Sequence, residues 1–127
     1  MATLRDVERI ALSLPDVTKE TTEDGRPSYA VNGKTFCFHR EPRKDAPFDD
    51  VFVFRTDGLE SKELLLADPR GIFFTTPHWN GYPAVLIHLP DLKQLGKAEV
   101  RDAVVEAWLT RAPKKLAKAW LAENGES

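Results

Sequence analysis

Apolar residues recur every three or four positions at the start of the chain, and this spacing predicts an amphipathic helix. The positions that carry the pattern are Leu4, Val7, Ile10, Ala11 and Leu14. Thr3 has the character of an N-cap, Asp6 places an acid in the first turn, and Pro15 ends the run. The polar stretch 16–27 then predicts an ordered connection without helix or strand.

Three segments in the first half of the chain have the composition of strands. Residues 28–31 and 34–40 are separated by an Asn-Gly pair, which suits a two-residue type I′ turn and predicts a hairpin. The charged segment 41–50 predicts a longer loop. Residues 51–55 are short and rich in Val and Phe, so they predict a third strand.

The second half of the chain mixes helix and strand signals. In chain order, the predicted elements are a helix from Asp57 as N-cap to Asp68-Pro69, strands at 72–75 and 84–89, a helix at 97–109, and a last helix that starts at Pro113. A loop at 76–83, rich in Pro, Gly and aromatic residues, joins the two strands.

The strands come in runs and do not alternate singly with helices, so the pattern favours the α+β class. We expect a two-layer sandwich of order α-β(3)-α-β(2)-α, with a largely antiparallel five-stranded sheet and an extra C-terminal helix. The chain has 127 residues, an ordinary length for one domain. We therefore treat residues 1–127 as a single domain.

Alternation along the predicted strands assigns their side chains to two faces of the sheet. Phe36 and Phe38 should face one way, and Cys37 and His39 the other. The last strand should divide in the same manner, with Val85, Ile87 and Leu89 opposite Leu86 and His88. The expected core between sheet and helices consists of Phe36, Phe38, one of Phe52 and Phe54, Val85, Ile87 and Trp108. The other face should be more polar and should carry some of the histidines.

Composition places the chain among ordinary soluble globular proteins, with 42% hydrophobic and 30% charged residues. No apolar run is long enough to cross a bilayer, and no charged start precedes an apolar segment as in a secretion signal. The single cysteine, Cys37, cannot form an internal disulfide. We expect a cytoplasmic protein without a membrane partner, and a monomer rather than an obligate oligomer.

Charge is distributed unevenly along the chain, although the net charge is only −2. Residues 34–44 hold four basic residues and one acid, and residues 111–118 hold four basic residues and no acid. The rest of the chain is therefore strongly acidic. If the two basic segments meet on one surface, that surface would attract a polyanion. Otherwise they are solvated faces that serve solubility.

Several motifs follow one another along the chain. The main block runs from Leu64-Leu65-Leu66-Ala67-Asp68-Pro69 through Phe73-Phe74 and Thr76-Pro77-His78-Trp79-Asn80-Gly81-Tyr82-Pro83 into Val85-Leu86-Ile87. Further motifs are Ser28-Tyr29-Ala30-Val31, Gly33-Lys34, Ala107-Trp108 and Ala112-Pro113-Lys114-Lys115-Leu116. In this order, and over nearly the whole chain, these motifs resemble the MmcQ/YjbR family of small bacterial proteins.

The resemblance implies a secretion-chaperone-like two-layer fold, which agrees with the order of elements derived above. Family members are usually described as predicted DNA-binding proteins with a proposed double-wing contact. This chain departs from the family pattern at two positions. His88 stands where the strand commonly ends in Arg, and Trp79 stands where Tyr is frequent. The first departure removes a fixed positive charge from that strand.

Our first hypothesis is therefore a non-enzymatic DNA-binding protein that contacts phosphates through its two basic segments. The candidate phosphate contacts are Lys34, Arg40, Arg43, Lys44, Arg111, Lys114, Lys115 and Lys118. Lys114, Lys115 and Lys118 should project together from the last helix, opposite an anchoring side formed by Leu116, Ala117, Trp120 and Leu121.

The alternative is a protein- or small-ligand-interaction module that uses an open sheet face and the 76–83 loop. Aromatic residues on a loop can stack on a base or cap a ligand, or they can pack beneath a rigid turn. The candidate contact residues in this loop are Thr76, His78, Trp79, Asn80 and Tyr82.

Metal binding and catalysis have weaker support in the sequence. Cys37, His39 and His88 could share one sheet face, but no established zinc-ligand spacing is present. The three histidines could act as acid–base groups, yet no nucleophile or nucleotide motif accompanies them. We expect no metal, no cofactor and no enzymatic activity.

Overall fold

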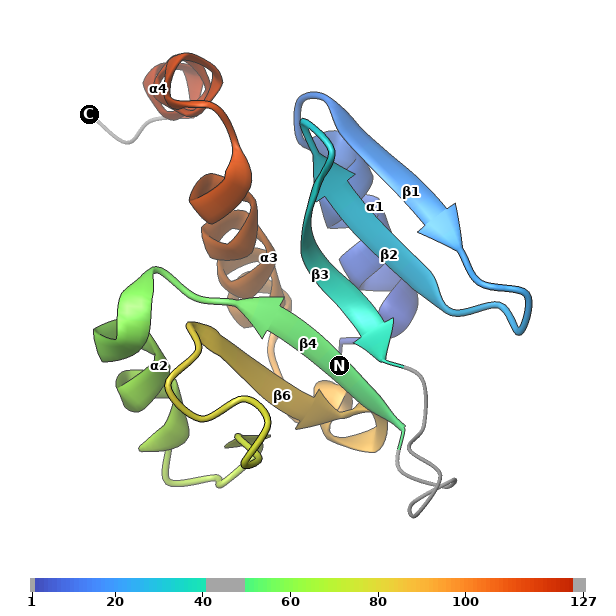
Figure 1. The fold of residues 1–127 in the computed structure, drawn as a ribbon, viewed down its shortest axis with the longest axis vertical. Helices are drawn as coiled ribbons and strands as arrows, with labels where there is room; N and C mark the ends of the chain where they lie inside the picture. Colours follow the sequence, from blue (N-terminus) through green and yellow to red (C-terminus); the bar gives the residue numbers. More distant parts are fainter. Residues whose placement is uncertain (1, 41–49, 125–127) are drawn as a thin grey trace.

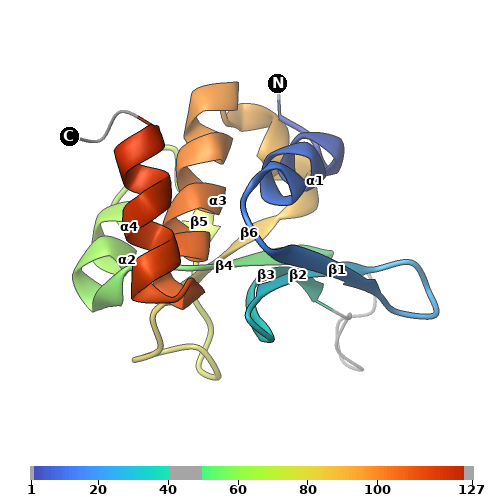
Figure 2. The same cartoon turned by 90° about the horizontal axis from the view of Figure 1, so that it is seen from above.

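The computed structural model describes residues 2–40 and 50–124, and it contains one antiparallel sheet with helices packed on one face (Figures 1 and 2). The strands are β1 (Val17–Thr21), β2 (Pro27–Val31), β3 (Lys34–Arg40), β4 (Val51–Arg55), β5 (Phe73–Phe74) and β6 (Ala84–His88). The helices are α1 (Leu4–Ser13), α2 (Gly58–Leu66), the 3₁₀ helix η1 (Leu89–Gln94), α3 (Lys97–Arg111) and α4 (Lys114–Glu123). None of the described helices combines the length and the apolar character needed to span a membrane.

The α+β class and the largely antiparallel sheet are confirmed, but the predicted strand count is wrong. The sheet has six strands in the order β1-β2-β3-β4-β6-β5, and the additional strand β1 lies in the stretch expected to be a connection. Asp16 adopts a φ of 58°, which turns the chain back after α1. β1 is an edge strand with four of its five residues exposed, so it lacks the alternation of apolar residues that marks a half-buried strand.

A β-bulge changes the expected division of β3 between the two faces. The pairing of β2 with β3 shifts between Tyr29 and Ala30, so that Tyr29 lies opposite Cys37 while Ala30 lies opposite Thr35. Phe36 is the extra residue of the bulge. Phe36 and Cys37 are consequently both buried in the core beneath the helices, whereas Phe38 packs on the opposite face. The prediction that Phe36 and Phe38 share a face, and that Phe38 belongs to the main core, is therefore wrong.

The main core lies between the sheet and helices α1 and α3. Its most completely buried large side chains include Trp108, Tyr29, Phe36, Phe52 and Phe54. Val85, Ile87 and Trp108 lie in this core as predicted, and both phenylalanines of β4 face it. The Trp108 indole Nε1 donates a hydrogen bond to the carbonyl oxygen of Pro15 at 3.2 Å, which connects α3 to the end of the first helix.

The opposite face of β4 and β6 is apolar, not polar as predicted. Val51, Val53, Ala84 and Leu86 are buried there, and Phe38, Phe74 and Trp79 pack against them. The central strands are thus covered on both sides, which explains why residues 51–54 form a continuous apolar run. Of the histidines, His88 lies exposed at the end of β6, with its ring stacked on Phe74 at a centroid distance of 4.4 Å.

Candidate functional site: a basic aromatic pocket between β3 and β4

A pocket opens where strands β3 and β4 diverge. The two strands pair from Arg40–Val51 to Cys37–Phe54, and beyond this last pair they separate toward the C-terminal end of α3 (Figure 1). The cavity has a volume of about 360 Å³. We call it the β3–β4 pocket; its lining residues are Lys34, Thr35, Phe36, Phe38, Val53, Arg55, Trp79, Tyr82 and Arg111. The set includes three cations and no carboxylate.

The cations of the β3–β4 pocket come from three different elements. Lys34 begins β3, Arg55 ends β4, and Arg111 is the last residue of α3. The Nη1 group of Arg55 donates a hydrogen bond to the Tyr82 hydroxyl at 3.1 Å, and its guanidinium carbon lies 5.0 Å from the centroid of the Tyr82 ring. Hydrogen bonding and positive charge from Arg55, supported by Arg111, lower the pKa of Tyr82 below its usual value. The phenol oxygen is thus in the field of two guanidinium groups.

Within the described part of the chain, none of the three cations forms an ion pair with a carboxylate. The Nε groups of Arg55 and Arg111 are also buried there without a hydrogen-bond partner. Two other arginines, by contrast, are neutralised: Arg26 pairs with two aspartates, and Arg70 pairs with Asp68 and Glu99. Guanidinium groups that line one cavity without a carboxylate partner favour an anionic ligand, because arginine forms strong charge-assisted hydrogen bonds with anions.

The aromatic side of the pocket is formed by the 76–83 loop and β3. The rings of Trp79 and Tyr82 lie nearly perpendicular, at 79°, with centroids 5.5 Å apart. Phe38 approaches Trp79 at 6.3 Å, and the exposed His78 meets the same indole edge-on at 5.4 Å. Trp79 is half-buried, whereas Tyr82 is 43% exposed and therefore offers part of its ring to solvent.

A buried lysine fixes this loop. The ammonium group of Lys62, on α2, donates hydrogen bonds to the carbonyl oxygens of Trp79 at 2.6 Å and Tyr82 at 2.7 Å. Lys62 is only 3% exposed, and burial lowers its pKa. The backbone N–H groups of Trp79 and Asn80 both donate to the Thr76 carbonyl, at 2.8 and 2.9 Å. These hydrogen bonds fix the backbone of the loop, and with it the positions of Trp79 and Tyr82.

Sequence reasoning missed Arg55 and Lys62. The Val- and Phe-rich pattern of residues 51–55 indicates a strand and gives no reason to single out Arg55. Lys62 could have been noticed, because it lies three and four positions before Leu65 and Leu66 and hence on the same side of α2. A lysine on the side of a helix that faces the protein is unusual and indicates a specific acceptor.

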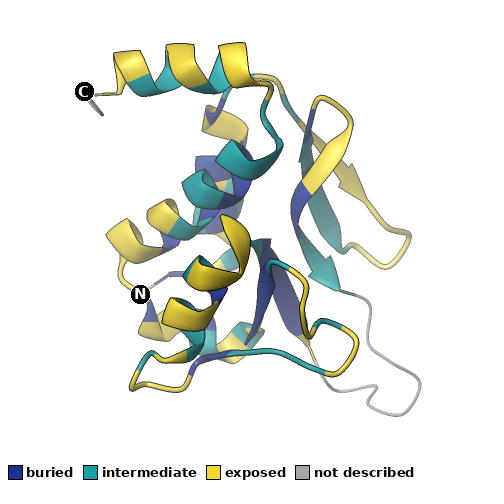
Figure 3. Ribbon diagram, turned by 60° about the vertical axis from the view of Figure 1, so that its left-hand side comes forward, coloured by how far each residue is buried: buried dark blue, intermediate teal, exposed yellow. Residues whose placement is uncertain are grey.

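The basic residues of α4 lie outside the pocket and are exposed. Lys114, Lys115 and Lys118 are exposed, while Leu116 and Trp120 pack against the main core. Figure 3 shows exposed and intermediate stretches alternating along α4. The Trp120 ring lies 5.6 Å from that of Trp108, which anchors α4 on α3. This arrangement of the last helix agrees with the predicted division into a basic side and an anchoring side.

The two basic segments meet through Lys34 alone among the described residues. Arg40 ends β3, six residues further along the strand, or about 20 Å away at the usual rise per residue. Its carbonyl accepts a hydrogen bond from Arg26 at 3.0 Å. Arg43 and Lys44 lie outside the described residues. Among the described residues, the two basic segments therefore meet at Lys34 and Arg111, which line the same pocket.

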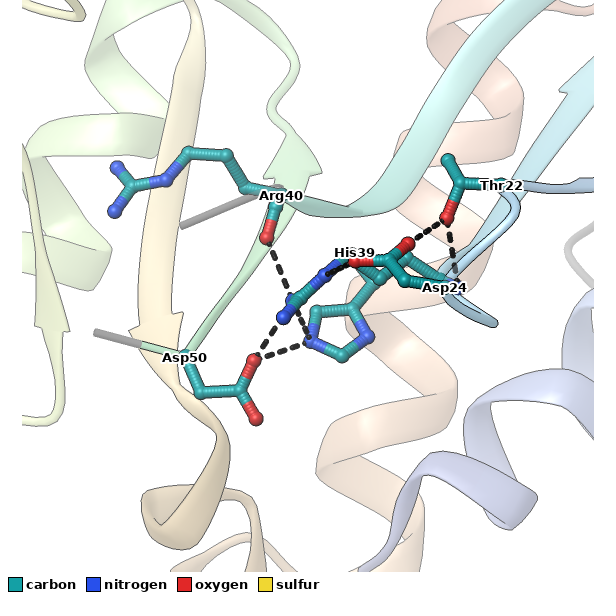
Figure 4. A network of polar contacts seen from close by, with 6 residues as sticks. Thr22, Asp24, His39, Arg40 and Asp50 are labelled. Atoms are coloured by element: carbon teal, nitrogen blue, oxygen red, sulfur yellow. Dashed lines mark hydrogen bonds and ion pairs between the residues drawn. The ribbon is translucent and has the colours of Figure 1, made fainter. Parts of the chain in front are cut away.

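Near Arg40, a second polar cluster joins Arg26, His39 and Asp50 (Figure 4). The His39 Nε2 lies 2.6 Å from the Asp50 carboxylate and 2.9 Å from the Arg26 guanidinium. This nitrogen can donate to Asp50 or accept from Arg26, but not both at once. Burial acts to raise the pKa of Asp50, but the hydrogen bonds from His39 and Arg26 outweigh it and lower the pKa. Arg26 is neutralised in this cluster.

The structure does not bring the residues of the considered zinc site together. Cys37 is buried in the main core, and burial raises the pKa of its thiol well above the usual value. His88 lies opposite Val51, on the other face of the sheet. Across residues 2–40 and 50–124, no group of three or more His, Cys, Asp or Glu side chains is arranged to hold a metal ion.

Another groove, of about 390 Å³, lies between α3 and α4 and carries the opposite charge. Asp57, Asp102 and Glu106 line it, with Arg101 as its one described cation. Glu106 is already engaged, because its carboxylate accepts hydrogen bonds from the Asp57 backbone N–H at 2.8 Å and from the Ser61 hydroxyl at 2.6 Å. This acidic groove would repel a polyanion, so the β3–β4 pocket is the better candidate.

Comparison with known proteins agrees with this fold. The chain is 37% identical over 139 residues to the uncharacterised proteins Rv2570 of Mycobacterium tuberculosis and Mb2600 of Mycobacterium bovis, covering 98% of this chain and all of each relative. The crystal structure of Deinococcus radiodurans protein DR2400, a DUF419 domain, superposes with a TM-score of 0.64 at 18% identity, over 98% of this chain and 89% of that one. The family model named YjbR matches residues 12–110. The chain therefore belongs to the YjbR family.

Proposed function

We propose that this protein binds nucleic acid, with phosphates contacted by the cations of the β3–β4 pocket and by the exposed lysines of α4. The observation that carries the proposal is the convergence of Lys34, Arg55 and Arg111 on one cavity without a described carboxylate partner. Lysine and arginine bind phosphates chiefly by releasing condensed counterions.

The chain continuity of the basic residues supports this proposal. Arg111 ends α3, and only Ala112 and Pro113 separate it from Lys114 at the start of α4. The pocket cations therefore continue along the chain into the exposed basic side of α4. The acidic remainder of the molecule would orient this side toward a polyanion, although the net charge of the whole chain is −2.

The alternative of a module with an open apolar sheet face has less support. Val51, Val53, Ala84 and Leu86, on the face away from the helices, are already buried. Phe38, Phe74 and Trp79 pack against these residues. The central strands therefore offer little free apolar surface for a protein partner.

The test is binding of a fluorescently labelled duplex DNA, measured by anisotropy at several salt concentrations. We expect affinity to fall as salt rises. Changing Lys114, Lys115 and Lys118 to Ala should flatten the slope of log K against log salt by roughly two to three units, because each lost phosphate contact contributes about 0.9. The loss should be similar for all sequences, since phosphate contacts carry no sequence information.

The matched control removes three exposed cations elsewhere: Arg5 on α1, Lys93 on η1 and Lys97 at the opposite end of α3 from Arg111. This variant loses the same charge but should keep more of the salt slope. Circular dichroism should report wild-type folding for both variants, because exposed lysines contribute little to stability. Absence of salt-dependent binding by the wild-type protein would refute the proposed function.

A further inference from the structure

We infer that the β3–β4 pocket is a subsite for one unpaired nucleotide, which it recognises by its phosphate and its base together. This inference rests on the proposed nucleic-acid binding and makes it more specific. The shared chemistry is that of a nucleoside phosphate, whether it is an unpaired residue of a strand or a free mononucleotide. The inference stands on the charge, the aromatic rings, the size and the rigidity of the pocket.

The phosphate would be held where the two guanidinium groups approach Tyr82. Arg55 now donates to the Tyr82 hydroxyl at 3.1 Å, and Arg111 acts on the same oxygen. A phenol oxygen is a weaker acceptor than a phosphate oxygen, which forms charge-assisted and often bidentate hydrogen bonds with arginine. Neither guanidinium is paired with a carboxylate among the described residues, so the charge of both is available to a phosphate.

The base would lie against the aromatic corner formed by Trp79 and Tyr82. Their rings are nearly perpendicular, so a planar group stacked on one ring presents its edge to the other. Tyr82 is 43% exposed and Trp79 is partly exposed, so both rings can be reached from solvent. Stacking of a base on an aromatic side chain is strong and tolerates any base, because each base has a π-face.

The volume of the pocket limits the size of the ligand that it can hold. A cavity of about 360 Å³ lies near the lower end of the range for small-molecule pockets, so it suits one nucleotide and not a base-paired segment. A paired base inside a duplex is stacked between its neighbours, so its faces are not free to stack on Trp79 or Tyr82. The ligand must therefore be an unpaired nucleotide, at a strand end, in a single strand or free.

The pocket is also formed in advance. Lys62 fixes the carbonyls of Trp79 and Tyr82, and the backbone N–H of Tyr82 donates to the Trp79 carbonyl at 3.0 Å. The β4 side is held because the Thr56 N–H donates to the Pro83 carbonyl at 2.9 Å. Binding therefore does not require ordering of the loop, which would weaken affinity.

The test compares two labelled DNA hairpins with the same duplex, one with a flush end and one with a short single-stranded overhang. We expect the overhang hairpin to bind more tightly and to quench the fluorescence of Trp79. Trp79→Ala should weaken binding of the overhang hairpin by roughly 5- to 150-fold, the range expected for the loss of one stacked base. It should leave the flush hairpin nearly unchanged.

Matched variants separate recognition from folding. Trp79→Phe keeps a ring and should retain most of the preference for the overhang, while the quenching of tryptophan fluorescence on binding disappears, because Trp108 and Trp120 lie outside the pocket. Arg55→Gln should weaken the overhang hairpin more than the flush hairpin, whereas Arg101→Gln, on α3 but in the acidic groove, should not. Thermal unfolding of each variant checks that the fold is intact.

Competition experiments distinguish a free mononucleotide from an unpaired nucleotide of a strand as the ligand of the pocket. A mononucleotide that displaces the overhang hairpin better than its nucleoside or inorganic phosphate supports joint recognition of phosphate and base. Equal affinity for the two hairpins in wild type and in Trp79→Ala, without competition by a mononucleotide, would overturn the subsite and leave general DNA binding intact. Mononucleotide binding without hairpin binding would support the subsite and instead refute the proposed function.

Discussion

At the scale of single residues, the site depends on side chains whose environment is unusual for their type. Lys62 is an almost fully buried lysine without a described carboxylate partner. Its ammonium group donates to two backbone carbonyls instead. Tyr82 is exposed yet lies beside two arginines. Each arrangement changes a property that can be measured directly.

The two tyrosines of the chain should titrate far apart. Arg55 favours the phenolate of Tyr82, so the pKa of Tyr82 is lowered from 10.0. Burial raises the pKa of Tyr29, with support from the neighbouring Glu8. An alkaline titration followed by absorbance should therefore show one tyrosine ionising at a pH below the ordinary range for tyrosine and the other at a pH well above it. Arg55→Gln should move only the first step to higher pH, and two coincident steps in wild type would contradict this geometry.

Replacing Lys62 should destabilise the protein and loosen the 76–83 loop. Lys62→Met keeps the length of the side chain but leaves the carbonyls of Trp79 and Tyr82 without their donor. An unsatisfied buried polar group costs about 1–3 kcal/mol, and we expect a loss in that range by urea unfolding. Lys93→Met, at an exposed lysine, should change stability little. Equal stability of both variants would mean that Lys62 does not hold the loop.

At the scale of elements, the bulge in β3 and the packing of α3 determine what the pocket contains. Because Phe36 is the extra residue in β3, Cys37 faces the helices and Phe38 faces Trp79. Without that shift, Phe38 would join the main core and the pocket would lose one aromatic wall. The end of α3, anchored by the buried Trp108, sets the position of Arg111.

Truncating Trp108 should therefore weaken the fold strongly. The side chain is fully buried, packs on Trp120 and donates to Pro15. Trp108→Ala should lower the free energy of unfolding by about 3–5 kcal/mol, as usual for a large core residue. Leu64→Ala is a suitable control because Leu64 is 72% exposed. Equal melting temperatures of Trp108→Ala and wild type would contradict the assigned packing.

At the scale of the whole molecule, a cluster of charges joins the connection between α2 and β5 to η1 and α3. Arg70, in the connection between α2 and β5, binds Asp68 at 2.7 Å and Glu99 of α3 at 2.6 Å. It also donates to the Gln94 carbonyl at 3.0 Å. Hydrogen bonds from Arg70 lower the pKa of both carboxyl groups, that of Asp68 to about 2 and that of Glu99 below its usual value.

This cluster predicts a pH dependence of stability. The pKa of Asp68 is lower in the folded than in the unfolded chain, so its contribution is complete above about pH 4 and is lost as pH falls through about 2. Asp68→Asn should thus be less stable than wild type near neutral pH, and the difference should disappear in strong acid. Urea unfolding at several pH values measures it. A difference that persists unchanged at pH 2 would rule out this ion pair as its source.

Much of the fold could be predicted because it depends on local physics. The period of apolar residues identified α1 and α3, the Asn-Gly pair identified the β2–β3 hairpin, and the Val-Phe run identified β4. These signals are carried by neighbouring residues. The sequence alone therefore determined the α+β class and most element boundaries. It also determined that the lysines of α4 lie on the side opposite its apolar residues, because helical periodicity alone separates the two sides of a helix.

Only the tertiary structure decided the rest. β1 is polar and pairs at an edge, so its hydrogen bonds to β2, and not its side chains, make it a strand. The bulge at Phe36 reversed the expected faces of β3, because one extra residue shifts every later side chain. The β3–β4 pocket joins Lys34, Arg55 and Arg111 from distant parts of the chain. Their meeting depends on where strands diverge and a helix ends, and no local pattern encodes either position.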